Sequence, residues 1–208
     1  MLNALFSFIS RFLKRERRLS LGLYGKPNVG KTTLANKICA DLAGEKIGIA
    51  SPIPHETRTV WRKNGVKLSF NGKKMNLEIL DMPGIADRID YRDLLLYGLD
   101  EESAKSRAAD AAKGVAEAMG WIGKLDAALV VVDCADGNPN NQVNMTVIKS
   151  LELSGKPIIL VANKIDMRSA NITRVKETFP EYPIVEVSAL TGKNITNLYE
   201  AISTRLTS

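Results

Sequence analysis

A glycine-rich stretch near the start of the chain, GKPNVGKT at residues 25–32, constrains the fold more than any other feature. A short apolar segment at residues 19–24 precedes it, and a helical pattern at residues 31–42 follows it. This succession of strand, glycine-rich turn and helix surrounds a phosphate group with backbone N–H groups and the positive end of a helix. In such a P-loop, Lys31 reaches the β- and γ-phosphate oxygens and the Thr32 hydroxyl holds Mg²⁺. The residues expected to contact the nucleotide here are Gly25, Asn28, Val29, Gly30, Lys31, Thr32 and Thr33.

A second motif, NKID, contains Asn163, Lys164 and Asp166 and follows the apolar run at residues 156–162. That run predicts a buried parallel strand, and ligands bind at the carboxyl ends of such strands. The Asp166 carboxylate can accept two hydrogen bonds from the N1–H and 2-amino groups of guanine, whereas adenine offers neither donor there. The motif therefore predicts a preference for GTP and GDP, with an ATPase as the weaker alternative.

Strand and helix patterns alternate along the rest of the chain. Asn71-Gly72 joins two strand patterns and predicts a hairpin, while Pro52 and Pro54 predict a loop over residues 44–60. Further strands are expected at residues 66–70, 74–81, 125–133, 156–163 and 183–188, and helices at 91–122 (one or two), 141–153, 169–178 and 194–206. We predict an α/β fold, a doubly wound and mostly parallel six-stranded sheet flanked by helices, with the motifs at the carboxyl ends of strands.

Composition is consistent with one soluble α/β domain and a short extension. The 208 residues are 45% hydrophobic but contain no apolar run long enough to span a membrane. The apolar start lacks the charge order and cleavage site of a secretory signal, so a cytoplasmic location is expected. Cys39 and Cys134 lack metal-binding spacing and are expected to be reduced thiols.

The motifs GKPNVGKT, HETR at residues 55–58, DMPG at 81–84, NKID and SALTGKNI at 188–195 together resemble the Era, TrmE and EngA group of small GTP-binding proteins. The resemblance covers residues 19–206 and implies a P-loop NTPase G domain over residues 19–208. It also implies a GTPase that acts as a Mg²⁺-dependent molecular switch, and many members act in ribosome assembly or RNA modification. Era carries a C-terminal RNA-binding KH domain, whereas this sequence stops after the last expected helix. We therefore expect that domain to be absent and do not transfer the RNA function of Era directly.

The resemblance also assigns roles to individual residues. Thr57, with Thr59 as the competing candidate, matches the threonine that binds Mg²⁺ and senses the γ-phosphate. Gly84 offers its N–H group to the γ-phosphate, and the loop formed by Ser188, Ala189 and Leu190 supports the guanine base. The residues implied to hold Mg²⁺ are Thr32, Thr57 and Asp81, and those implied in catalysis are Lys31, Thr57, Gly84 and Asn28.

The residue after DMPG predicts slow hydrolysis. Ile85 stands where Ras-like proteins have a glutamine, and an aliphatic side chain cannot orient the attacking water. In related members the asparagine corresponding to Asn28 helps to coordinate K⁺. Alternatively Asn28 only stabilises the loop. Arg58 could act as a charge clamp, but we expect it to be a solvated arginine of the switch. His55, the single histidine, is expected to be an exposed loop residue.

Residues 1–18 are predicted to form a basic amphipathic helical extension. The apolar positions in residues 2–13 follow helical spacing, and residues 1–20 contain five basic side chains and one acidic side chain. Such a helix can bind an anionic membrane surface, pack on its own domain or a protein partner, or contact RNA phosphates. We expect no DNA partner.

The region at residues 87–123 is longer than its counterpart in the resembling proteins. Five apolar residues lie near the second switch, the segment that begins at DMPG. They form either core or a surface that binds a partner depending on the bound nucleotide, and they are Leu94, Leu95, Leu96, Tyr97 and Leu99. Three functions stay open at this point. They are a slow GTPase switch with an unknown protein partner, a ribosome- or RNA-associated assembly factor, and a membrane-tethered scaffold with little turnover.

Overall fold

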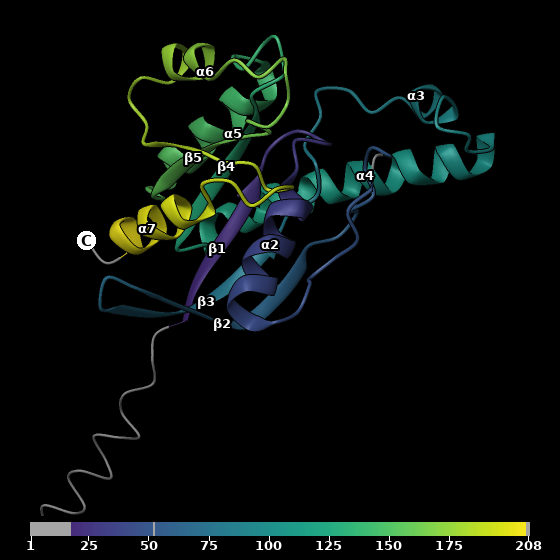
Figure 1. Cartoon of the computed structure of the whole chain (residues 1–208). Coiled ribbons are helices and arrows are strands. Elements are labelled where there is room, and N and C mark those ends of the chain that lie inside the picture. Colours follow the sequence, from purple (N-terminus) through teal and green to yellow (C-terminus); the bar gives the residue numbers. More distant parts are fainter. Residues whose placement is uncertain (1–17, 52, 207–208) are drawn as a thin grey trace, which may run out of the picture.

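The computed structural model describes residues 18–51 and 53–206 (Figure 1). The extension predicted for residues 1–18, including its amphipathic helix, lies outside the described residues except for Arg18. Its boundary with the G domain stays a prediction.

The centre of the molecule is a six-stranded sheet in the order β2-β3-β1-β4-β5-β6. All neighbouring pairs are parallel except β2 and β3, which are antiparallel and form an edge hairpin. The predicted doubly wound, mostly parallel sheet is therefore confirmed. The strands are β1 (Arg18–Tyr24), β2 (Trp61–Phe70), β3 (Lys73–Asp81), β4 (Ala127–Asp133), β5 (Ile158–Asn163) and β6 (Ile184–Glu186).

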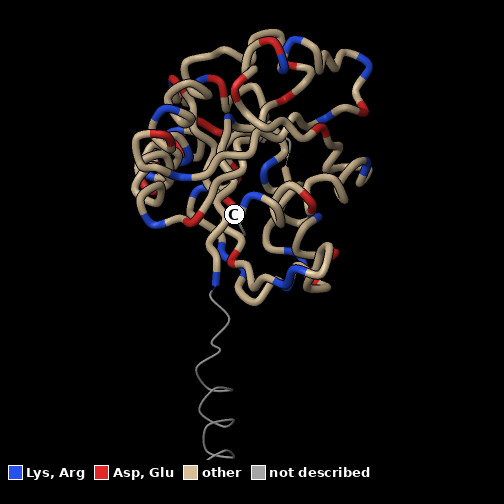
Figure 2. Tube along the Cα trace, turned by 90° about the vertical axis from the view of Figure 1, so that its left-hand side faces the viewer, with Lys and Arg blue, Asp and Glu red and all other residues tan. Residues whose placement is uncertain are grey.

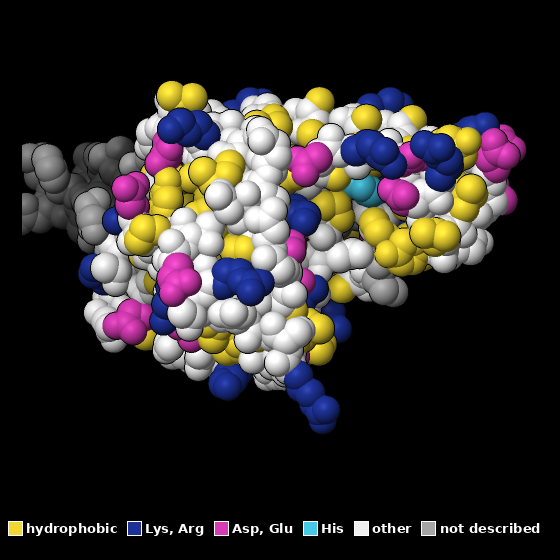
Figure 3. Space-filling view, turned by 90° about the horizontal axis from the view of Figure 1, so that it is seen from above, with side chains coloured by type: hydrophobic (Ala, Val, Ile, Leu, Met, Phe, Trp, Pro, Cys, Tyr) yellow, Lys and Arg dark blue, Asp and Glu magenta, His cyan; other side chains and the backbone are white. Residues whose placement is uncertain are grey.

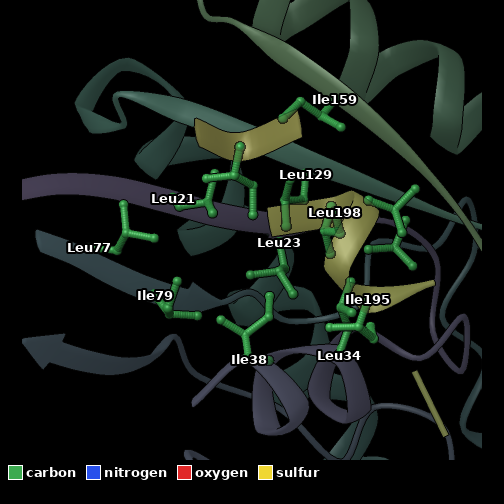
Figure 4. Close-up of a cluster of buried hydrophobic side chains, with 14 of the residues drawn as sticks. Leu21, Leu23, Leu34, Ile38, Leu77, Ile79, Leu129, Ile159, Ile195 and Leu198 are labelled. Carbon is green, nitrogen blue, oxygen red and sulfur yellow. The ribbon is translucent and has the colours of Figure 1, made fainter. Parts of the chain in front are cut away.

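Helices cover both faces of the sheet, as Figure 1 shows. Successive residues of a strand point to opposite faces, so Leu129 of β4 belongs to one core cluster and Val130 to the other. The first cluster, drawn in Figure 4, packs against α2 (Lys31–Ala43) and α7 (Ile195–Leu206). The second packs against α4 (Glu101–Trp121), η1 (Ile122–Lys124), α5 (Gln142–Leu153) and α6 (Ile172–Thr178).

The region predicted to contain one or two helices at residues 91–122 forms α3 (Tyr91–Leu95) and α4, followed by η1. Asp90 and Asp100 cap the two helices by accepting backbone N–H bonds from Arg92 and Ser103. The far end of α4 projects beyond the body of the domain and carries α3 beside it (Figure 1). We call α3, α4 and their connection the arm.

The structure refines three further predictions. No described helix combines the length and apolar character that crossing a membrane requires. Cys39 and Cys134 are free thiols, as predicted, and both are buried, which raises their pKa values to about 11 and about 12. Leu94 is buried, but Leu95, Leu96 and Tyr97 are exposed by 38%, 85% and 47%, so the apolar stretch is divided between core and surface.

Candidate functional site

The P-loop needs glycine at two positions. Gly25 and Gly30 have φ angles of 144° and 98°, a region that other residues rarely adopt. A Cβ atom at Gly25 would lie 2.4 Å from the carbonyl oxygen of Val131, and one at Gly30 would lie 2.3 Å from Asn163 Nδ2. The loop therefore packs so closely on β4 and on the NKID motif that any side chain would displace it.

Lys31 at the start of α2 is buried beneath this loop. Its Nζ atom donates to the carbonyl oxygens of Gly25 at 3.1 Å and Lys26 at 2.7 Å. Burial lowers the Lys31 pKa to about 8, while the nearby Asp81 carboxylate acts in the opposite direction. The ammonium is thus held within the loop by carbonyl groups, in position for an anionic ligand to replace them.

Three side chains from separate elements meet beside Lys31. The Thr32 hydroxyl donates to Asp81 Oδ2 at 2.7 Å and lies 3.0 Å from the Thr57 hydroxyl. Asp81 is fully buried, and its Oδ1 atom has no hydrogen-bond partner among the described residues. Burial raises the Asp81 pKa to about 6, and contacts with Thr32, Lys31 and Thr57 oppose this shift. A buried carboxylate with an unpaired oxygen beside two hydroxyls is the donor set of a hard divalent cation such as Mg²⁺.

Thr57 and Thr59, the two candidate threonines, lie in the loop at residues 44–60, which we call the first switch. Only Thr57 faces this cluster. Thr57 is 8% exposed, whereas Thr59 is an exposed residue. The geometry therefore favours the sequence-based choice of Thr57.

The DMPG segment packs against the P-loop. A Cβ atom at Gly84 would lie 2.9 Å from Pro27 Cα, so only glycine allows this approach. The backbone N–H of Ile85 donates to the carbonyl of Gly25 at 3.2 Å, while its side chain is buried in the second core cluster. No polar side chain is thus available at the position where a glutamine would orient water.

At the other end of the site, the buried Asn163 joins two loops. Its Nδ2 atom donates to the Val29 carbonyl at 2.8 Å, and its Oδ1 atom accepts from the Ala189 N–H at 2.9 Å. Lys164 donates to Asp133 Oδ2 at 2.6 Å. The Ser188 hydroxyl accepts from the Thr191 N–H and holds the 188–190 loop in shape.

The cleft between these loops has a volume of about 560 Å³. Among the sequence-predicted residues that line it are Asn28, Gly30, Lys31, Thr32, Thr33, Thr57, Gly84, Asn163, Lys164, Asp166, Ala189 and Leu190. The structure thus brings the P-loop, Thr57 and Gly84 together with the NKID motif and the 188–190 loop at one cleft. Gly25, Val29, Asp81 and Ser188 lie behind this lining and support it.

Sequence reasoning missed part of the lining and misplaced one residue. Ile49, Ser51 and Ile53 line the cleft from the loop after α2, where turn residues gave no signal of a ligand. His55 also lines the cleft and is half-buried, so the expectation of an exposed histidine was wrong. Burial lowers the His55 pKa, as do the nearby charges of Lys31 and Arg107. Figure 3 looks at this end of the molecule and shows hydrophobic side chains on both sides of the histidine.

Arg58, considered as a charge clamp, does not line the cleft. Its Nη1 atom lies 3.6 Å from Asp110 Oδ2 on α4. The alternative of a charge clamp supplied by Arg58 has no support in this geometry.

The family model described as "50S ribosome-binding GTPase" matches residues 20–164, which contain the P-loop, both switch segments and the first two residues of NKID. The chain belongs to this family. Among curated relatives, GTPase Era of Alkaliphilus oremlandii is 32% identical over 185 residues, which are 86% of this chain and 53% of that protein. GTPase Der of Fusobacterium nucleatum is 31% identical over 196 residues, which are 89% of this chain and 39% of that protein.

Solved structures of Era have the same fold. A single-residue variant of Aquifex aeolicus Era bound to GDP and AlF4⁻ matches with a TM-score of 0.65 and 29% identity, over 91% of this chain and 57% of that one. Era in complex with MgGDPNP and nucleotides 1506–1542 of 16S ribosomal RNA matches with a TM-score of 0.66 and 26% identity, over 92% and 57%. This Era-like GTPase chain therefore spans about half the length of the Era proteins it matches.

Proposed function

We propose that the chain binds Mg²⁺-GTP and GDP in the cleft and hydrolyses GTP slowly as a molecular switch. The observation that supports this best is the buried Asp81 carboxylate, which lies against the Thr32 hydroxyl at 2.7 Å directly beside the P-loop. The match to the GTPase family model over residues 20–164 supports it independently.

Each part of the cleft has a role in this proposal. Lys31 binds the phosphate oxygens, and the N–H groups of the P-loop surround them. Thr32 and Thr57 hold Mg²⁺ with their hydroxyls, and Asp81 orients it; bound Mg²⁺ neutralises charge on the phosphate oxygens. The N–H of Gly84 binds the γ-phosphate, so that loss of this phosphate releases the second switch.

Guanine selectivity is the first test. In our proposal Asp166 accepts from the N1–H and 2-amino groups, and Ser188, Ala189 and Leu190 support the base. The Asp166→Asn variant should lose GDP affinity and gain affinity for XDP, because its amide donates to the 2-oxo group of xanthine. Unmatched polar groups cost about 1–3 kcal/mol each, which corresponds to a clear change in Kd. Calorimetric titration that gave unchanged affinities for both nucleotides would refute the assignment.

Hydrolysis is expected to be slow in Na⁺ and faster in K⁺, because Ile85 provides no polar side chain and the exposed Asn28 lines the cleft. We propose that Asn28 helps to bind K⁺ beside the phosphates. Single-turnover GTP hydrolysis in matched NaCl and KCl should show the difference in the wild type and not in Asn28→Ala. Equal wild-type rates in the two salts would indicate that an activator protein supplies the catalysis.

Association with the ribosome is a second candidate function, supported by the family description and by the structure of Era with 16S ribosomal RNA. The chain has a formal net charge of +6, while basic and acidic residues are interspersed along the described backbone (Figure 2). Co-sedimentation with purified ribosomal subunits, with GTP analogue or GDP, tests the idea. If the chain pelleted to the same extent with and without subunits, and salt did not change this, the result would count against ribosome association.

A further inference from the structure

The segment that carries Thr57 runs along one face of α4. Arg107 Nη1 lies 3.3 Å from Glu56 Oε2, and Asp110 Oδ2 lies 3.6 Å from Arg58 Nη1. One step further, the backbone N–H of Val60 donates to Glu117 Oε2 at 3.4 Å. The order of contacts along residues 56–60 follows the order of residues along α4, so the two segments lie in register.

The spacing on both segments is regular. Arg107, Asp110, Gly114 and Glu117 are separated by three or four residues and therefore share one face of α4. Their partners on the other segment are alternate residues, which face α4. Thr57 lies between two of these partners, and its hydroxyl faces Thr32 instead.

The closest approach occurs at Gly114, in the middle of this face. A Cβ atom there would lie 2.5 Å from the backbone carbonyl oxygen of Arg58 and 3.0 Å from Pro83 Cβ. Arg58 follows Thr57, and Pro83 precedes Gly84, so a single glycine contacts both switch segments. Backbone atoms cannot rotate away from an added methyl group, so a larger residue here must displace the segment itself.

The steric contact carries more weight than the ion pairs. The side chains of Arg58 and Asp110 are 41% and 39% exposed, and ion pairs at such positions contribute little. Arg107 and Glu56 are better shielded, at 15% and 28%.

We propose that this face of α4 is a docking track that positions Thr57 for Mg²⁺-GTP. Arg107, Gly114 and Glu117 are positioning residues that act through residues 56–60 and do not contact the nucleotide. The inference rests on the proposed function for the role of Thr57. It adds that the arm and the nucleotide site are coupled, because a displacement of α4 displaces the metal-binding threonine.

The test compares Gly114→Ala with Gly120→Ala. Both glycines lie within α4 and both variants gain the same helix propensity, but a Cβ atom at Gly120 meets nothing within 4 Å. We expect Gly114→Ala to weaken binding of a fluorescent GTP analogue in Mg²⁺ by about tenfold, the effect of losing one well-placed polar contact. GDP affinity should match that of Gly120→Ala, because Thr57 senses the γ-phosphate. Equal GTP affinities for the two variants would overturn the proposal.

A charge-reversal cycle provides a second test that does not depend on a clash at Gly114. Arg107→Glu and Glu56→Arg each bring like charges together and should each weaken binding of the GTP analogue in Mg²⁺. The double variant restores an opposite pair and should recover part of the affinity. Single variants without effect, or a double variant no better than the worse single one, would contradict the docking.

Hydrogen exchange separates this inference from the proposed function. With GDP bound, amides of residues 56–60 should exchange faster in Gly114→Ala than in Gly120→Ala, because the Val60 N–H loses Glu117. This readout requires neither GTP nor hydrolysis. If exchange is faster in Gly114→Ala while the two variants bind Mg²⁺-GTP equally, the track exists but Thr57 lacks its proposed role. If exchange is the same in the two variants, the track itself is refuted.

Discussion

Asn163 shows how one residue can join the two ends of the site. We expect Asn163→Ala to lower the free energy of unfolding by about 1–3 kcal/mol, because the buried Val29 carbonyl and Ala189 N–H both lose their partner. GDP affinity should fall as well, since both the P-loop and the 188–190 loop lose their anchor. Urea unfolding with and without GDP measures the two effects. Asn197→Ala, an exposed position on α7, serves as the control and should change stability by less than about 0.5 kcal/mol.

At this scale, motif residues were predictable and their neighbours were not. Thr32, Thr57 and Asp81 could be assigned to one cluster because each stands in a motif whose chemistry needs it. His55 was misplaced, and the partner of Arg58 was not foreseen, because the surroundings of both residues depend on α4. Arg107 and Asp110, the charges they meet, are far away in the sequence, and only the folded arm brings them to the switch.

At the scale of elements, the hairpin between β2 and β3 provides a sharp test of turn chemistry. Asn71 and Gly72 have φ angles of 47° and 76°. Gly72→Ala should cost about 1–2 kcal/mol of stability from backbone conformation alone, because a Cβ atom there meets nothing within 4 Å. Gly123→Ala is the matched control, since its Cβ atom is equally free and its φ is not positive. Equal midpoints in urea would show that the turn carries no strain.

The periodicity of the sequence predicted most element positions, but it did not predict the first half of β2. The sequence predicted the first hairpin strand at residues 66–70, whereas β2 begins at Trp61. The additional residues include Gly65 with a φ of 74°, and the pairing with β3 shifts register between Lys63 and Val66. A glycine within a polar edge strand has the sequence signature of a turn, so the bulge concealed the strand.

At the scale of the whole molecule, the alternation of strands and helices predicted the layers and the sheet, whereas the direction of the arm could not be predicted. The alanine-rich sequence of α4 indicates a helix without indicating where it packs. Its contacts with the switch depend on Gly114, which by itself resembles an ordinary helix-weakening residue. The arm also presents Leu95, Leu96 and Tyr97, so a partner bound there would act near α4.

Removal of residues 1–17 tests the domain organisation. β1 begins at Arg18 and pairs with β3 and β4, so the backbone that leads into the P-loop is complete without the preceding residues. We expect the truncated chain to bind GDP as tightly as the full chain and to melt at a similar temperature with GDP saturating. The truncated chain should no longer bind the membrane or the ribosome. Flotation with anionic vesicles measures the first interaction, and co-sedimentation with ribosomal subunits measures the second.

If the apolar residues of this segment instead pack as core, each would contribute about 1.5–3 kcal/mol when fully buried. A large fall in melting temperature would then identify the segment as part of the domain, because the loss of several such side chains exceeds what GDP binding can offset.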